Sequence, residues 1–371
     1  MNYYFSLFLI VLLASCTAQQ GDKPNTEKKD FVRVSDGQFF IGDNPYYFIG
    51  TNYWYGPLLA SSYGDVERLR RDLDALEAYG VNNLRVLIGA EGPLHSDFRV
   101  TPTLQTQPGT YDKKLLKGLD VFMAELARRD MKAVLYFTNN WIWSGGMAQY
   151  LNWNGYGEIP NPFREGTSWA QYLEYTRQFH SCADSKDDLR AYITHIISRT
   201  NSVTGVPYTE DPAIMAWQVA NEPRVIAQEN KEAFRKWLHA TAELIDSLAP
   251  NQLVSTGSEG KAGSLKDLEL YKTNHAHPAI DYLTMHIWPK NWGWYDPDNE
   301  APSTDTAIAA ATEYMAGHKA VARELGKPIV LSEFGFPRDG QSLEKSASLN
   351  YRNKFYAYIF EQVATSKNNK G

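Results

Sequence analysis

Two glutamates at the ends of apolar, strand-like segments are the side chains best placed to carry out chemistry. Glu222 follows the apolar run 214–220, and Glu333 lies at the end of the run 329–334. Two carboxylates facing one cavity can hydrolyse a glycosidic bond, because one protonates the leaving oxygen while the other attacks or stabilises the developing oxocarbenium ion. A lone glutamate at a strand end more often forms a salt bridge or caps a helix, but two in such settings favour catalysis.

Seven apolar runs predict the strands that position these glutamates. After an initial hairpin at 31–41, the runs span 47–53, 83–88, 133–138, 214–220, 253–257, 282–287 and 329–334. Short apolar runs are typical of parallel strands buried on both faces. Amphipathic helical stripes lie between them, at 66–76, 115–126, 234–248, 307–325 and 351–364. Strand–helix alternation over this length predicts an α/β fold, the (β/α)₈ TIM barrel.

The same count predicts that one strand of the barrel is missing. The two glutamates end strands four and seven, at the face that is catalytic in such barrels. A closed barrel needs an eighth strand to satisfy both edges of its sheet, and only one helix follows the seventh run before Gly371. Unless a strand has been miscounted, we expect strand eight to be absent and the catalytic domain, residues 31–371, to be incomplete at its C-terminus.

Several motifs resemble the clan of retaining (β/α)₈ glycosidases that includes glycoside hydrolase family 5, and within it the β-mannanases. They are Gly-Thr-Asn-Tyr-Trp-Tyr-Gly at 50–56, Asn-Leu-Arg-Val at 83–86, Asn-Asn-Trp at 139–141, Asn-Glu-Pro-Arg at 221–224 and Glu-Phe-Gly-Phe-Pro-Arg-Asp at 333–339. The resemblance covers the chain from about residue 31 to its end. It implies a retaining hydrolase of β-1,4-mannosidic bonds in mannan, glucomannan or galactomannan, with no cofactor.

The resemblance also implies a role for each matching residue. Glu222 matches the general acid/base and Glu333 matches the nucleophile. Asn221 matches the residue that hydrogen-bonds the sugar 2-hydroxyl, a contact that can strengthen in the transition state. Arg85 matches the arginine that favours the ionised nucleophile, and His286 matches the histidine of the −1 subsite.

Trp141 and Arg224 match positions that line the binding cleft of related mannanases. Trp288 is a departure from the family pattern, because many members have a tyrosine there that hydrogen-bonds the nucleophile. An indole N–H donates a single hydrogen bond and has no phenol chemistry, so the environment of Glu333 is expected to differ. The tryptophan that the family places after strand eight has no counterpart in this chain.

The N-terminus predicts export. Residues 1–15 carry no charged side chain and contain the apolar run 7–13, which is too short to span a bilayer and reads as a signal peptide. Leu-Ala-Ser-Cys at 13–16 resembles a bacterial lipobox, so Cys16 is the expected lipidation site and residues 16–30 a polar tether. The protein would then be anchored to a bacterial outer membrane or cell surface through this lipid alone. The alternative is a secreted protein whose Cys16 stands there by chance.

Composition limits the other partners. The net charge is −6 without a long basic run, which argues against nucleic acid. The 10 Trp and 23 Tyr, many in Gly- and Asn-rich stretches, suit stacking on sugar rings, although many must serve core packing. We predict no metal site, because His275 and His277 lack a third ligand. Asp296, Asp298 and Glu300 read as a solvated acidic loop. A monomer is expected.

The long segment 143–184 is predicted to be a loop that forms a wall at one end of the cleft. Two alternatives to a mannanase remain at this stage. One is a β-1,4-glucanase of the same fold, and the other is a non-catalytic glycan-binding lipoprotein on a degenerate barrel. The sequence leaves open whether cleavage is internal or from chain ends, and whether galactose branches are tolerated.

Overall fold

The computed structural model describes residues 30–368 of the chain. The predicted signal peptide, the lipidation site Cys16 and almost all of the tether lie outside these residues. No helix in the described part is long and apolar enough to cross a membrane. Cys182 is buried and forms no disulfide within the described residues; its sulfur accepts a hydrogen bond from the Ser185 amide at 3.4 Å.

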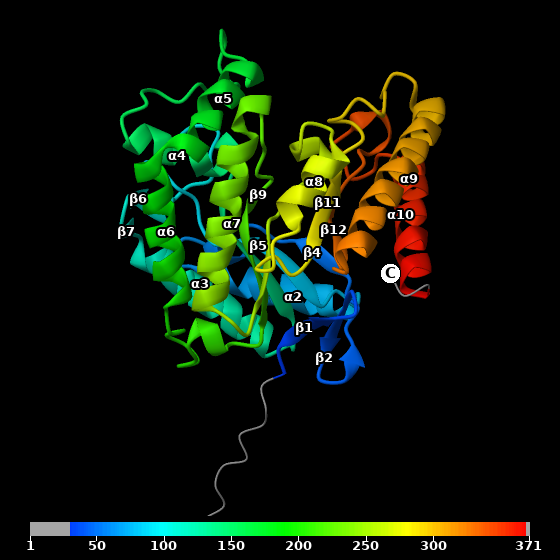
Figure 1. Cartoon of the computed structure of the whole chain (residues 1–371). Helices are drawn as coiled ribbons and strands as arrows, with labels where there is room; N and C mark the ends of the chain where they lie inside the picture. Colours follow the sequence, from blue (N-terminus) through cyan, green and yellow to red (C-terminus); the bar gives the residue numbers. More distant parts are fainter. Residues whose placement is uncertain (1–29, 369–371) are drawn as a thin grey trace, which may run out of the picture.

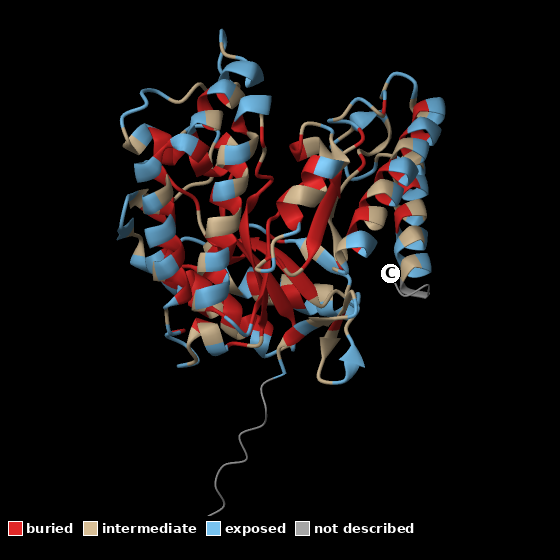
Figure 2. Cartoon of the chain, viewed as in Figure 1, coloured by how far each residue is buried: buried red, intermediate tan, exposed pale blue. Residues whose placement is uncertain are grey.

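All seven predicted strands are present, in two parallel sheets (Figure 1). The first sheet has the order β4 (Gly50–Asn52), β5 (Asn83–Leu87), β8 (Lys132–Asn139), β9 (Ile214–Asn221) and β10 (Leu253–Ser255). The second pairs β11 (Leu283–Ile287) with β12 (Ile329–Phe334). Every residue of β5, β8, β9, β10 and β11 is buried, and Figure 2 shows these central strands surrounded by more exposed helices. Burial on both faces explains why the strands are apolar along their whole length.

The two sheets meet differently at their two junctions. Beyond β10, the His286 amide donates to the Glu259 carbonyl at 3.0 Å and the Thr284 hydroxyl donates to the Ser258 carbonyl at 2.7 Å. At the other junction, Asn52 Nδ2 on β4 donates to the Ser332 carbonyl on β12 at 2.9 Å, but no strand ladder joins them. Every residue of β12 is partly exposed. The described strands therefore do not close the barrel, and none follows β12 within residues 335–368.

Helices cover the outside of the sheets (Figure 1). They are α1 (Gly56–Ala60), α2 (Val66–Ala78), α3 (Lys113–Ala127), α6 (Ala183–Ile197), α7 (Lys231–Leu248), α8 (Leu268–His275), α9 (Glu300–Leu325) and α10 (Asn350–Asn368). The amphipathic stripes predicted from the sequence fall within α2, α3, α7, α9 and α10. Side chains define two of the starts, because Asp65 accepts from the Arg68 amide and Asp112 from the amides of Lys114 and Leu115.

The N-terminal hairpin closes the lower end of the barrel (Figure 1). It comprises β1 (Val32–Ser35) and β2 (Gln38–Ile41), to which the short β3 (Asn44–Pro45) adds. Val32 and Phe39 pack in one cluster with Val134, Met215 and Tyr282, which lie near the starts of the barrel strands. The opposite end of the barrel, where the strands finish, is left for polar side chains.

The prediction of one long loop over 143–184 is wrong. This segment holds α4 (Gly146–Trp153), α5 (Trp169–Thr176), the 3₁₀ helix η2 (Arg177–Ser181) and the start of α6, and its longest irregular stretch is 154–168. Residues 146–151 of α4 are all buried, Met147, Tyr150 and Leu151 among them. A capping box between Ser168 and Gln171 starts α5 by satisfying amides at its first turn. The aromatic residues of the segment therefore include packed helix residues, such as Tyr150 and Tyr172.

Candidate active site

The backbone at Glu222 is strained. Glu222 directly follows β9 and has φ of +50°, in the left-handed region that residues with a Cβ seldom adopt. Its amide donates to the Gly257 carbonyl at 3.0 Å, which holds this turn against the end of the neighbouring strand. Strain of this kind persists where the surrounding structure fixes it, and it is often found at functional sites.

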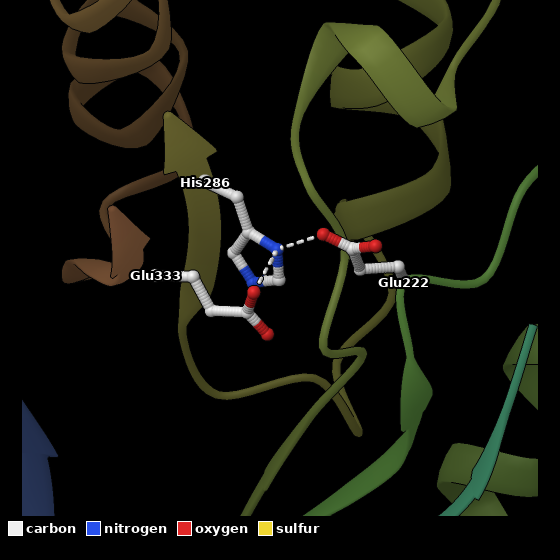
Figure 3. Close-up of side chains that lie close together, drawn as sticks. All are labelled: Glu222, His286 and Glu333. Atoms are coloured by element: carbon white, nitrogen blue, oxygen red, sulfur yellow. Dashed lines mark hydrogen bonds and ion pairs between the residues drawn. The ribbon is translucent and has the colours of Figure 1, made fainter. Parts of the chain in front are cut away.

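The Glu222 carboxylate is buried and has two donors on opposite oxygens. Trp141 Nε1 donates to Oε2. His286 Nδ1 lies 2.6 Å from Oε1, and Figure 3 shows this pair. Burial raises the pKa of Glu222, but the contacts with His286 and Trp141 and the charge of Arg224 outweigh it. The pKa of Glu222 is therefore held below its usual value in the substrate-free protein.

Glu333, on β12, faces Glu222 across the imidazole of His286 (Figure 3). Arg85 Nη1 donates to Oε1 of Glu333, and Trp288 Nε1 donates to Oε2 at 3.1 Å. The indole of Trp288 thus makes a single hydrogen bond to this carboxylate. One carboxylate oxygen of each glutamate and one nitrogen of His286 lie within 4.8 Å of one another.

Arg85 connects the strand ends around Glu333. Besides Glu333, its guanidinium donates to Gln218 Oε1 at 2.7 Å, Asn221 Oδ1 at 2.9 Å and Asn52 Oδ1 at 3.2 Å. The side chain is 6% exposed and lies over the Tyr136 ring, 4.6 Å from its centroid. Four strands, β4, β5, β9 and β12, are therefore joined through one buried cation.

A second hydrogen-bond network sets the position of Trp141. Asn139 Oδ1 accepts from the Trp141 amide at 3.0 Å and from Asn221 Nδ2 at 3.0 Å. Asn139 Nδ2 donates to the Ser144 hydroxyl at 2.9 Å, which fixes the amide orientation. The indole that contacts Glu222 is thus anchored to the residue beside Glu222.

Glu259 is a third carboxylate of the site, itself buried, that the sequence analysis missed. Arg224 donates to both of its oxygens, at 2.5 and 2.7 Å, and the guanidinium lies 4.6 Å from the centroid of the Trp141 ring. Burial and the neighbouring charge of Glu222 raise the pKa of Glu259 to about 7, against the opposing effect of Arg224. The signal in the sequence that pointed to Glu259 was its position, four residues after the end of β10.

The structure thus brings together every internal residue predicted for the site: Arg85, Trp141, Asn221, Glu222, Arg224, His286, Trp288 and Glu333. Residues that share this network but were not predicted are Asn52, Asn139, Gln218 and Glu259. Asn52 and Asn139 stood in quoted motifs without a role. Gln218 lies on β9, where an uncharged amide gives no warning of a catalytic neighbourhood.

Glu222, His286 and Glu333 are also the group of metal-type ligands found within residues 30–368. Their carboxylates already accept from Arg85, Trp141 and Trp288, and a guanidinium beside them opposes a cation. The other candidates do not converge. His275 Nε2 lies 2.8 Å from the Thr256 hydroxyl, whereas His277 pairs with Glu243 at 3.1 Å.

Comparison with known proteins places this geometry in a family. A model described as GH family 5 beta-mannosidase-like matches residues 29–371. The chain belongs to glycoside hydrolase family 5. A family 5 mannosidase structure from Rhizomucor miehei superposes with a TM-score of 0.85 at 31% identity, covering 92% of this chain and 83% of that one. The family 5 likeness makes the protein a glycosidase and confirms the (β/α)₈ fold class.

Named relatives agree with this assignment. A putative mannan endo-1,4-beta-mannosidase 9 from Oryza sativa is 26% identical over 98% of this chain and 84% of its own length. Mannan endo-1,4-beta-mannosidase 1 from Solanum lycopersicum is 28% identical over 94% of this chain and 83% of its own length. An endo-1,4-beta-mannanase structure from Rhizomucor miehei, 24% identical with a TM-score of 0.66, shares the fold over 84% of both chains.

One further buried acid lies behind the active site of this family 5 glycosidase. Glu91 is fully buried, and its Oε2 accepts from the Gly146 amide at 3.0 Å while its own amide donates to the Ser144 carbonyl at 2.9 Å. Glu91 therefore clamps the turn that follows Trp141. Burial raises the pKa of Glu91 to about 8, despite the opposing contacts with Gly146 and Thr138.

The clamp predicts a pH-dependent stability. Glu91 is protonated in the folded protein below about pH 8 but ionises above about pH 4.5 when unfolded. The stability that protonated Glu91 contributes to the folded protein is complete below about pH 4.5. This contribution falls by at most about 1.4 kcal/mol per pH unit as the pH rises, and it is lost above about pH 8. Glu91→Gln should therefore gain stability relative to wild type between pH 5 and 8. Urea unfolding measures this, with exposed Glu67→Gln as control; a pH-independent difference would contradict it.

Proposed function

We propose that this protein hydrolyses β-1,4-mannosidic bonds in mannan, glucomannan or galactomannan with retention of anomeric configuration. The observation that carries the proposal is that one carboxylate oxygen of Glu222 and one of Glu333 lie within 4.8 Å of each other. Retaining glycosidases hold their carboxyl groups about 5–5.5 Å apart, whereas inverting ones need about 6.5–9.5 Å to admit a water. The spacing supports double displacement through a glycosyl-enzyme intermediate.

Glu333 suits the nucleophile because Arg85 and Trp288 each donate to one of its carboxylate oxygens and so hold the carboxylate in place. Glu222 suits the acid/base. It protonates the departing oxygen as Glu333 bonds to the anomeric carbon, and it then takes a proton from the water that releases the sugar. Glycosylation removes the negative charge of Glu333, which lowers the pKa of Glu222 and favours its action as a base in the second step.

The substrate class rests on Asn221 and on the named relatives. Asn221 Oδ1 accepts a hydrogen bond from Arg85, and Asn221 Nδ2 donates one to Asn139. The amide of Asn221 is therefore held in one orientation beside Glu222. We assign this fixed amide to the sugar 2-hydroxyl, whose axial position distinguishes mannose from glucose. His286, Trp141 and Arg224 complete the walls around the reacting sugar, and the relatives' names specify mannan.

The stereochemical outcome tests this proposal. Proton NMR of mannohexaose digested in D₂O should show the β-anomer of the new reducing end first, followed by mutarotation. Early accumulation of the α-anomer would mean inversion and would overturn the mechanism. Faster turnover of carboxymethyl cellulose than of mannan would assign the protein to the β-glucanases. Mannan binding without release of reducing ends would make it a glycan-binding protein.

Substrates with different leaving groups distinguish the roles of the two carboxylates. Glu222→Gln and Glu333→Gln should each lower kcat on mannan by at least about 10³-fold with the fold intact. On a dinitrophenyl β-mannoside, whose leaving group needs no protonation, Glu222→Gln should still form the glycosyl-enzyme in a burst, whereas Glu333→Gln should not. A burst in Glu333→Gln alone would reverse the assigned roles, and bursts in both variants, or in neither, would contradict them.

We propose from the sequence that residues 1–15 direct export and that Cys16 carries the lipid, with the catalytic domain held on residues 16–30. Expression in a bacterium with labelled palmitate should mark the wild type and leave Cys16→Ser unlabelled. Equal labelling of both proteins, or of neither, would contradict a lipid anchor at Cys16. This test is independent of the catalytic assignment.

A further inference from the structure

A row of aromatic rings leads away from the catalytic glutamates. It starts at Trp141, whose indole donates to Glu222. The Trp169 ring meets Trp141 edge-on with centroids 5.5 Å apart, and Phe163 meets Trp169 edge-on at 5.6 Å. Phe98 stacks on Phe163 at 5.7 Å with an interplanar angle of 26°. We call Phe98, Phe163 and Trp169 the outer aromatic path.

The rings of the outer aromatic path are open to solvent. Phe98 is 59% exposed, Phe163 50% and Trp169 43%, so mutual packing covers only about half of each. Contiguous exposed apolar rings are costly in water and mark binding surfaces more often than scattered ones do. Figure 1 places α5, which begins at Trp169, at the end of the molecule opposite the β1–β2 hairpin. The path therefore lies on the same side as the active site.

The backbone holds these rings in place. Phe98 has φ of +61°, a conformation that is strained for a bulky side chain. Its neighbours are tied to the segment after Trp141, because Arg99 Nη1 donates to Gln149 at 2.8 Å and the Val100 amide donates to the Trp143 carbonyl at 2.8 Å. Trp169 is the first residue of α5, behind the Ser168 capping box. Exposed rings on fixed backbone form a preorganised surface.

We propose that the outer aromatic path binds hexose units of the polysaccharide that lie beyond those at the catalytic glutamates. The path continues outward from Trp141, which contacts Glu222, and the exposed part of each ring can pack on the apolar C–H face of a sugar. The charges beside it, Arg164 and Asp97, lie 4.0 Å apart and cancel, which favours an uncharged polymer. A β-1,4-linked mannan chain is the occupant; this identity, but not the site, rests on the proposed function.

The kinetic test compares a long substrate with a short one. The double variant Phe98→Ala/Phe163→Ala should lose about fivefold to tenfold in kcat/KM on soluble galactomannan, mostly through KM. Turnover of a short aryl β-mannobioside should change by less than about twofold, since it does not reach the path. The double variant with leucine at both positions keeps apolar bulk without a flat ring and should show the same loss. Tyr79→Ala, an exposed ring at the end of α2, is the matched control.

A binding test separates this proposal from the proposed function. In the Glu333→Gln background, native gels cast with galactomannan or with barley β-glucan should show retardation by galactomannan that the leucine pair abolishes. Equal retardation with and without the two phenylalanines, or equal kinetic losses on both substrates, would contradict sugar binding at the outer aromatic path. Retardation only by β-glucan, lost in the leucine pair, would uphold the path while rejecting mannan as the substrate.

Discussion

The buried guanidinium of Arg85 is the interaction on which the arrangement of the site depends. A buried cation is tolerated only when anionic and polar partners surround it. Here the partners are Glu333 and the side-chain oxygens of Asn52, Gln218 and Asn221, supplied by strands on both sides of Arg85. Each strand must therefore end at the right register for its oxygen to reach the same charge. The polar network sets the strand ends, and the apolar strand bodies supply the rigidity.

The two glutamates of the site acquire different properties from the side chains around them. Glu333 faces Arg85 directly, whereas Glu222 faces His286 and the indole of Trp141. Glu259 extends the contrast, because it neutralises Arg224 and limits how strongly that cation acts on Glu222. The balance of charge around Glu222 therefore depends on a residue that contacts neither the nucleophile nor Glu222 itself.

Sequence reasoning reached the elements whose signal is local. Strands buried on both faces are apolar along their length, so β8 and β9 were found, and the glutamates at strand ends were found with them. Glu259 and Glu91 were missed because a single glutamate carries no sign of its burial, which depends on strands distant in sequence. Segment 143–184 was misread as one loop, because α4 and α5 have eight residues each and are too short for a helical periodicity to stand out. The absence of strand eight from the chain stays a prediction, and β12 remains partly exposed.

The hairpin of β1 and β2 has a consequence for substrate traffic. Val32 and Phe39 fill the end of the barrel where the strands begin, among Val134, Met215 and Tyr282. The interior is packed with side chains, so a sugar chain has no route along the barrel axis. A polymer must lie across the rim, and both halves of a cleaved chain must leave by the side from which the whole chain came. Departing product and arriving substrate therefore compete for the same surface.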